Sequence, residues 1–467
     1  MRARLVAASG LVAILATGSS AFAAPPWSEP QSVGAAAPLV SGATLAFAPN
    51  GTALLSRRLS SGGRDRDSVA TLAPTGRLVD HALLPDLLAA DPAVLRRGRV
   101  ALLRQRVLSG PNARLRRVRL SLSVGTTARP LGRRRPRRLA SYTPVPSDDT
   151  QGPRLAGARN GDLAVVWMEF RGDEFASGRY RVRLALRRAN GRFVRTRTVA
   201  AGPIEGNRES HSVAVAFGAR RSVVVAYALD GPGGRFIASR TVGRGRRVGR
   251  QQILGPHAGL VRLELRATRS GRAIAAWQTQ DAGEEANSPS VVRAAMRTPG
   301  AARFGAARVM DPGETNERVP GRPALAMAPD GSAVLAWSNA RGQYPGVSFP
   351  ARASIAEPGA GFGPVFELAA GGAVTDAAAR PDGALLVTWG DVHDFTLAGP
   401  RESRAALRPG PGEPFGAPEL IATSSPGLAG GGRTLVAAFD PRTGRPAVAW
   451  TATNDGTDVL QIANRSG

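Results

Sequence analysis

The stretch Pro329-Asp330-Gly331-Ser332-Ala333-Val334-Leu335-Ala336-Trp337 decides the fold of this chain, because its pattern recurs along the sequence. A glycine is followed six residues later by a tryptophan, with apolar residues between them. The same offset separates Gly161 from Trp167, Gly271 from Trp277, Gly383 from Trp389 and Gly444 from Trp450. Weaker units keep the frame with Arg221 and Tyr227, Gly51 and Arg57, and Gly98 and Arg104. One interval repeated over most of a chain indicates many copies of one structural unit.

Each unit predicts a hairpin followed by a strand that is covered on both faces. Asp-Gly and Asn-Gly pairs between apolar runs favour tight turns with positive φ at both central residues. The strand after the turn is nearly continuous in apolar residues, as in Ala333 to Trp337 and Val223 to Tyr227. Such a strand needs cover on both sides. The blades of a β-propeller provide this cover, and a tryptophan at one place in every blade is interpreted as packing.

A second hairpin completes each unit. Its outer strand is expected to begin and end at apolar residues six apart: Phe193 and Val199, Val248 and Leu254, Phe304 and Met310, Phe362 and Leu368, Phe415 and Ile421. Pro364 and Pro418 fall inside these strands, and proline favours a blade edge because it cannot donate to the ladder. Intervals of about 56 residues fit four strands with their loops. The prediction is an all-β propeller of about eight four-stranded blades, or seven if the Gly98 unit does not form a full blade.

The two ends of the chain are predicted to share one blade. The last unit has room for a strand at Asp458 to Asn464 but not for an outer strand. Trp27 to Val33 matches Phe415 to Ile421 in its aromatic, proline and final apolar positions. We therefore expect the N-terminal strand to complete the last blade and close the ring, which removes an exposed edge.

The Pro-Asp-Gly turn and the apolar strand after it, clearest at Ala328 to Trp337 and Arg380 to Trp389, resemble the repeats of TolB-like secreted bacterial β-propellers. Sialidase-type propellers are also similar, but their Ser-x-Asp-x-Gly-x-x-Trp box does not occur here. The resemblance implies a fold and no particular reaction.

The first residues predict export. Arg2 and Arg4 precede a short apolar stretch, and Ala21-Phe22-Ala23 is typical of a signal-peptidase site. Residues 1–23 are therefore predicted to be a Sec-type signal peptide with cleavage near Ala23, and residues 24–467 a single propeller domain. With no other long apolar run and no cysteine, we expect a secreted or extracytoplasmic monomer without a transmembrane segment or disulfide.

Propellers carry ligands on the face formed by the loops after the second strand and between blades. The candidates there are Asp148, Asp149, Glu169, Asp173, Arg208, Glu209, His211, Glu284, Glu317, Arg318, Arg341, Tyr344, Asp391, His393 and Asp394. Only Asp391-x-His393-Asp394 has the character of a metal site, and isolated clusters of this kind are usually solvated loop residues. The prediction is no metal and no cofactor.

The formal net charge is +27, and arginine dominates residues 96–138, where no acidic residue occurs. We interpret this richness first as codon bias and as the solvated edge of a degenerate second blade. The alternative is attachment to an anionic envelope polymer, a glycan or a protein through Arg133, Arg134, Arg135, Arg137 and Arg138. Nucleic acid is the least favoured partner, because aromatic residues are sparse in this segment.

No catalytic residue is predicted. Regular repeats without a nucleophile, metal or cofactor signature favour a non-catalytic propeller for binding or scaffolding in the cell envelope or outside the cell. The alternative is a glycan-processing hydrolase, sialidase-like or of another glycosidase type. It would need carboxylates from two loops to face each other across roughly 5–9 Å.

Overall fold

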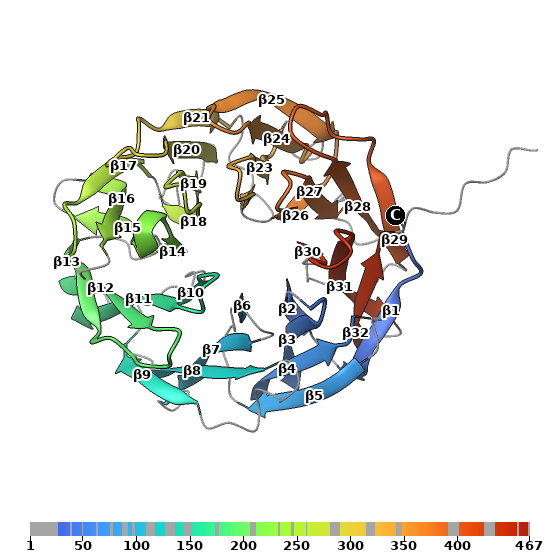
Figure 1. Cartoon of the computed structure of the whole chain (residues 1–467), viewed down its shortest axis with the longest axis horizontal. Coiled ribbons are helices and arrows are strands. Elements are labelled where there is room, and N and C mark those ends of the chain that lie inside the picture. The colour runs from blue at the N-terminus through green and yellow to red at the C-terminus, as the bar shows by residue number, and fades with distance from the viewer. Residues whose placement is uncertain are drawn as a thin grey trace, which may run out of the picture.

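The structure of the chain is a computed structural model in which eight four-stranded antiparallel sheets form a ring (Figure 1). It describes residues 27–37, 40–48, 50–61, 64–74, 78–85, 92–95, 99–108, 117–126, 136–143, 152–172, 177–205, 212–231, 234–243, 247–257, 259–280, 290–313, 323–341, 348–390, 401–424, 435–454 and 457–465. Blades are numbered 1 to 8 in chain order. The first strand of each blade lies nearest the ring centre.

Blades 1 to 4 follow the chain without interruption. Blade 1 contains β2 (Val40–Phe47), β3 (Ala53–Ser61), β4 (Arg64–Leu72) and β5 (Leu78–Pro85). Blade 2 contains β6 (Pro92–Leu95), β7 (Arg99–Val107), β8 (Val118–Thr126) and β9 (Arg137–Tyr142). Blade 3 contains β10 (Arg154–Gly157), β11 (Leu163–Gly172), β12 (Ser177–Arg187) and β13 (Arg197–Glu205). Blade 4 contains β14 (Val213–Phe217), β15 (Val223–Gly231), β16 (Gly234–Val242) and β17 (Gln252–Pro256), with the turn η3 (Ala219–Arg221).

Blades 5 to 7 repeat this order, and blade 8 joins the two ends. Blade 5 contains β18 (Leu260–Ala267), β19 (Ala273–Gln280), β20 (Val291–Arg297) and β21 (Arg308–Asp311). Blade 6 contains β22 (Ala324–Met327), β23 (Ala333–Ser338), β24 (Ala351–Ala356) and β25 (Phe362–Ala369). Blade 7 contains β26 (Ala373–Ala379), β27 (Leu385–Gly390), β28 (Arg401–Arg408) and β29 (Glu419–Ser424). Blade 8 contains β30 (Val436–Phe439), β31 (Pro446–Asn454), β32 (Thr457–Asn464) and β1 (Gln31–Ala37).

The predicted architecture is confirmed. The unit at Gly98 forms a complete blade, so there are eight blades and not seven. The predicted closure is confirmed as well, because β1 pairs with β32 with Val33 opposite Leu460. Trp27 forms a bridge with Arg465 just before β1. One strand from the start of the described chain and three from its end thus make blade 8.

The repeat tryptophans fill the seams between neighbouring blades. Trp167, Trp277, Trp337, Trp389 and Trp450 are all at most 1% exposed. Trp167, for example, packs in one cluster with Leu103 and Tyr142 of blade 2. Burying such a large ring removes much apolar surface from water. These tryptophans therefore bind the blades to one another, as their fixed interval predicted.

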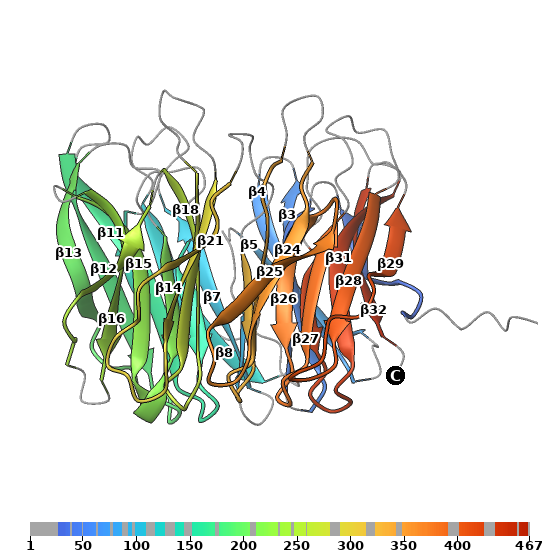
Figure 2. The same cartoon turned by 90° about the horizontal axis from the view of Figure 1, so that it is seen from above.

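The strands run between two opposite faces of the ring (Figure 2). At one end, hairpins join the first strand of each blade to the second and the third strand to the fourth. We call this end the turn face. We call the opposite end, where second strands finish and third strands begin, the loop face. Within the described ranges, no helix is long and apolar enough to cross a membrane.

The hairpin turns differ from the prediction of two positive φ angles. At Ala328 to Ser332, only Gly331 has positive φ, at 100°. Gly331 N donates to Ala328 O at 3.0 Å, and Ala328 N donates to Ser332 O at 2.8 Å. This is a three-residue hairpin whose glycine forms a bulge, so one left-handed residue suffices.

The outer strands begin later than predicted in four blades. They start at Arg197, Gln252, Arg308 and Glu419, and only the strand at Phe362 starts where expected. The aromatic residue before the strand serves another purpose. Phe304 is buried, and its backbone N–H donates to Gln252 Oε1 of the preceding blade at 2.9 Å. The spacing of apolar residues thus located each outer segment along the chain, but it did not predict at which residue strand pairing begins.

Blade 4 carries a strained turn, because Arg220 and Arg221 both have positive φ, at 51° and 61°. Arg221 stands where most other units have glycine. A left-handed conformation costs a residue with a Cβ about 1 kcal/mol or more. Arg221→Gly is expected to raise the free energy of unfolding by about 1 kcal/mol, as measured by denaturant unfolding. Arg269→Gly, at an exposed turn position without positive φ, is the control and should not stabilise. Destabilisation by Arg221→Gly would contradict the prediction.

Candidate functional site

Two of the predicted ligand-face residues, Glu169 and Arg341, lie in the described chain. The others lie outside the described residues: Asp148, Asp149, Asp173, Arg208, Glu209, His211, Glu284, Glu317, Arg318, Tyr344, Asp391, His393 and Asp394. Of the predicted polymer-binding arginines, Arg137 and Arg138 are described and exposed at the start of β9, whereas Arg133, Arg134 and Arg135 lie outside.

Arg341 belongs to a closed ion cluster at the loop end of the seam between blades 5 and 6. Its Nη2 donates to Asp311 Oδ1 at 3.2 Å, and Trp337 Nε1 donates to Asp311 Oδ2 at 2.9 Å. Asp311 is only 1% exposed. Burial lowers the pKa of Arg341, and the Asp311 charge opposes that shift. Arg352 Nη1 also lies 3.5 Å from Asp311 Oδ2, so the buried carboxylate is paired with two arginines and the cluster is a structural connection between blades.

Glu169 lies on β11, near the loop end of the seam between blades 2 and 3, and its cluster is open. Its Oε1 accepts a hydrogen bond from Trp167 Nε1 at 3.1 Å and lies 3.5 Å from Arg183 Nε. The Glu169 side chain retains 17% exposure. One hydrogen bond from Trp167 and an ion pair with Arg183 thus hold the carboxylate, while part of it faces solvent.

Tyr142 lies on the blade 2 side of this seam. Its ring centroid is 6.3 Å from that of Trp167. Burial raises the pKa of the Tyr142 phenol well above its usual value, and the negative charge of Glu169 raises it further. The phenol therefore stays protonated at neutral pH. Glu169, Trp167, Arg183 and Tyr142 are called the Glu169 cluster.

More arginines surround this cluster than its single carboxylate needs. On the paired strands β11 and β12, Arg171 lies opposite Arg179, and Glu169 lies opposite Arg181. Like charges directly opposite each other destabilise a sheet. None of these three arginines has an acidic partner within the residues that the structure describes. The excess positive charge suits an anionic ligand group beside Glu169.

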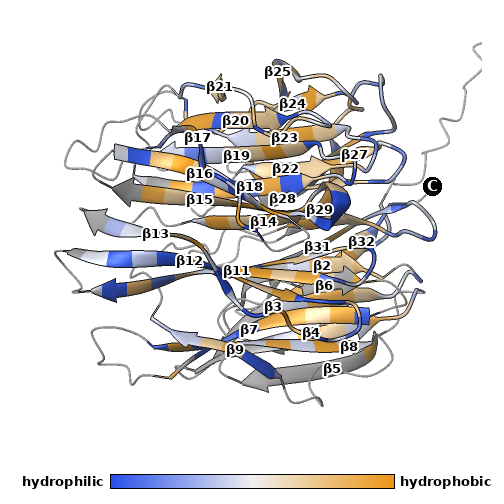
Figure 3. Cartoon of the chain, turned by 60° about the vertical axis from the view of Figure 1, so that its left-hand side comes forward, coloured by the Kyte–Doolittle hydropathy of each residue, from blue (hydrophilic) through white to orange (hydrophobic). Residues whose placement is uncertain are grey.

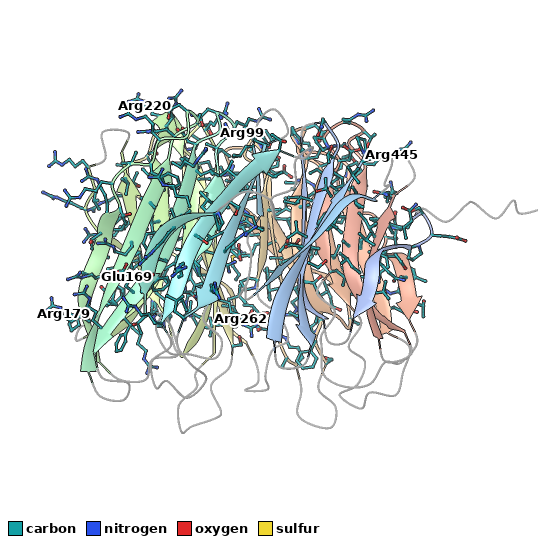
Figure 4. All side chains as sticks on the ribbon, turned by 90° about the horizontal axis from the view of Figure 1, so that it is seen from below. Arg99, Glu169, Arg179, Arg220, Arg262 and Arg445 are labelled. Atoms are coloured by element: carbon teal, nitrogen blue, oxygen red, sulfur yellow. The ribbon has the colours of Figure 1, made fainter. Side chains whose placement is uncertain are left out.

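The figures show where these residues lie. In Figure 3 hydrophilic blue appears along β12, as it does on parts of several other strands. In Figure 4 Glu169 and Arg179 lie on one blade, whereas Arg99 and Arg220 lie at the opposite face of the ring.

The described ranges contain no group of three or more histidine, cysteine or acidic residues that could hold a metal ion. The predicted Asp391, His393 and Asp394 cluster lies outside them.

Sequence reasoning found Glu169 but missed its neighbours. The alternation Arg179-x-Arg181-x-Arg183 was a signal, because residues two apart on a strand share a face. Tyr142 and Trp167 gave no such signal, since their proximity depends on how two blades pack.

Comparisons with known proteins place the fold only. No family model matches the chain, and no curated protein matches it. Among solved structures, it is similar to the polysaccharide lyase Uly1, with 10% identity, a TM-score of 0.46 and coverage of 91% of this chain and 90% of that one. It is also similar to an ulvan lyase bound to -[GlcA(1-4)Rha3S]-, with 12% identity, a TM-score of 0.44 and coverage of 93% and 98%. The arabinanase of Penicillium chrysogenum has 14% identity, a TM-score of 0.34 and coverage of 68% and 92%.

The prediction of a non-catalytic binding or scaffolding propeller is wrong. Solved structures similar to this chain include two polysaccharide lyases and an arabinanase. The prediction depended on repeat regularity and on the absence of a catalytic signature, and neither feature separates binding rings from catalytic ones. Identities of 10–14% carry over no substrate or reaction, so a function must be argued from this chain's own residues.

Proposed function

We propose that this chain is an exported glycan-processing enzyme that acts on an acidic polysaccharide at the loop end of the seam between blades 2 and 3. One observation carries the proposal: Glu169 is a partly exposed carboxylate, held by Trp167 and Arg183, beside arginines that lack acidic partners. A binding surface for anions would need the arginines but would not need an oriented carboxylate among them.

The residues divide into two roles. Glu169 moves a proton to or from the sugar, because an oriented carboxylate at the substrate is a common general acid or base. Arg171, Arg179 and Arg181 bind carboxylate or sulfate groups of the polymer, which guanidinium groups recognise through paired hydrogen bonds. Trp167 and Tyr142 are positioning residues that hold Glu169 and exclude water on the blade 2 side.

Export is part of the proposal. It is supported by the charged first residues, the apolar stretch and Ala21-Phe22-Ala23. An acidic polysaccharide outside the cytoplasm is a substrate that an exported enzyme would meet.

The proposal is tested by incubating the full chain with carboxylated, sulfated and neutral polysaccharides. New reducing ends report cleavage by either route, and ultraviolet absorbance of unsaturated sugars distinguishes elimination from hydrolysis. We expect products from at least one acidic polymer and none from neutral dextran. Products from dextran alone, or none from the whole panel, would refute an acidic polysaccharide as substrate.

A further inference from the structure

Three arginines from two blades converge at the opposite end of the same seam, on the turn face. Arg99 begins β7 and Arg137 begins β9, both in blade 2, whereas Arg187 ends β12 in blade 3. They lie a whole strand length away from the Glu169 cluster, on the face where Figure 4 labels Arg99. We call them the turn-end cluster.

The described contacts bring the three side chains to one place. Arg99 Nη1 donates to Ala189 O, in the hairpin turn of blade 3, at 3.2 Å. The Arg137 guanidinium lies 4.3 Å above the ring of Phe193. Arg187 Nη2 lies beneath the same turn, 3.3 Å from where a Cβ on Gly191 would be. Two arginines thus reach across the seam toward the third.

This arrangement leaves hydrogen-bonding capacity unused. Arg187 Nη1 is buried and has no hydrogen-bond partner among the residues that the structure describes. Burial lowers the pKa of Arg187, and the positive charges of Arg99 and Arg137 lower it further. A buried donor without an acceptor and a group of like charges both destabilise a fold. An anion placed among them would relieve both costs.

The protein supplies no such anion within the described ranges. Asp162 is the acidic residue of the neighbouring turn, and its carboxylate is already engaged. It accepts hydrogen bonds from Ala189 N at 2.8 Å and from Arg188 Nη1 at 3.4 Å. No described acidic side chain pairs with Arg99, Arg137 or Arg187.

We propose that the turn-end cluster binds a tetrahedral oxyanion, a sulfate or phosphate ester carried by an anionic polysaccharide. A single guanidinium fork satisfies a carboxylate, whereas three guanidinium groups from different directions match an ion with oxygens on several sides. This site is separate from the Glu169 cluster, and its occupation does not depend on catalysis there.

A polymer fits the surroundings better than a free ion. Further exposed arginines lie on the same face of blades 3 to 5: Arg159, Arg192, Arg220, Arg221, Arg247 and Arg269. A chain with repeated charges would engage them in succession. The site also differs from the predicted arginine-rich segment, because Arg187 lies outside that segment and completes the cluster.

Inorganic sulfate and phosphate test the site itself. At constant ionic strength adjusted with chloride, either ion should raise the unfolding temperature of the full chain in proportion to occupancy. Arg187→Gln should weaken binding roughly tenfold or more, because it removes charge-assisted hydrogen bonds. Arg445→Gln is the control, since it removes an exposed arginine of the same face in blade 8 (Figure 4). It also reports the general effect of sulfate on folding.

The stability of the ion-free variant distinguishes binding from structure. Arg187→Gln without sulfate should be as stable as the wild type or more stable, because a like charge is removed. A merely structural arginine would lower the unfolding temperature on removal. Arg137→Gln changes an exposed side chain without a hydrogen bond, and it should weaken binding to a similar extent. Equal sulfate binding by Arg187→Gln and Arg445→Gln would overturn the proposal.

Polymers test the source of the oxyanion. Dextran sulfate should bind the wild type at low salt and bind Arg187→Gln more weakly, whereas neutral dextran should not bind. Binding of polyphosphate together with dextran sulfate would support the shared oxyanion chemistry. Binding of polyphosphate alone would overturn the assignment to a polysaccharide. None of these readouts requires enzymatic activity, so they fail or succeed independently of the proposed function.

Discussion

Glu169→Gln is expected to lower turnover of the acidic polysaccharide about 10²- to 10⁴-fold, the usual contribution of a general acid or base. The amide has the shape of the carboxylate, and its oxygen still accepts the hydrogen bond from Trp167 Nε1. It cannot take up or release a proton at neutral pH. The loss should therefore appear in kcat, with the KM little changed.

The measurement compares initial rates of the wild type and Glu169→Gln on the acidic polymer that gives products. Glu413→Gln serves as the control, because Glu413 is an exposed carboxylate on the turn face, and its activity should equal that of the wild type. Unfolding temperatures of all three proteins should agree within a few degrees. Retention of wild-type kcat by a folded Glu169→Gln protein would remove Glu169 from the mechanism.

The two carboxylate clusters show why exposure decides which one is a site. Asp311 and Glu169 both accept a hydrogen bond from a seam tryptophan and both face arginines. Asp311 is sealed at 1% exposure, whereas the Glu169 side chain is 17% exposed and has spare arginines beside it. A carboxylate held by tryptophan and arginine thus connects two blades in one seam, whereas in another seam a similar carboxylate is exposed to solvent.

The sequence predicted the fold because the determining features are local. A glycine turn and a tryptophan six residues later lie in one hairpin, and their interval survives any variation in loop length. The match between Trp27 to Val33 and Phe415 to Ile421 likewise predicted the closure that β1 makes with β32. The type of turn was harder to predict from the sequence. The two-residue turn with two positive φ angles and the three-residue turn with a bulge both have glycine as their last residue.

The site was predictable only in part because its residues meet across a seam. Glu169 was expected in the loop after the buried strand, but it lies inside β11, three residues before the strand ends, so the hairpin alone gave its approximate place near the loop face. Tyr142 reaches Glu169 only after blades 2 and 3 pack together. Arg99 and Arg187 are 88 positions apart in the numbering and meet for the same reason. Sequence patterns describe one blade well and describe the space between two blades poorly.

Ring closure depends on the residue that anchors β1. Trp27 is 4% exposed and packs with Leu386, Ile421 and other residues of blades 7 and 8. Its Nε1 donates to Glu419 Oε2 at 2.9 Å, and Glu419 also accepts a hydrogen bond from Arg465 Nη2 at 2.7 Å. One indole therefore joins the incoming strand to both the last blade and its neighbour.

Trp27→Ala is expected to lower the free energy of unfolding by about 3–5 kcal/mol, the usual cost of truncating a buried tryptophan. Loss of the anchor also frees the edge of β32, which would then be available to pair with other chains, so the variant should aggregate more readily near its unfolding temperature. Trp27→Phe keeps most of the packing and loses only the indole N–H, and it should cost about 1 kcal/mol. Denaturant unfolding and light scattering measure the two effects. If Trp27→Ala unfolded like the wild type, β1 would not be holding the ring closed, since a strand whose anchor can be removed without cost contributes no stability to the blade that it completes.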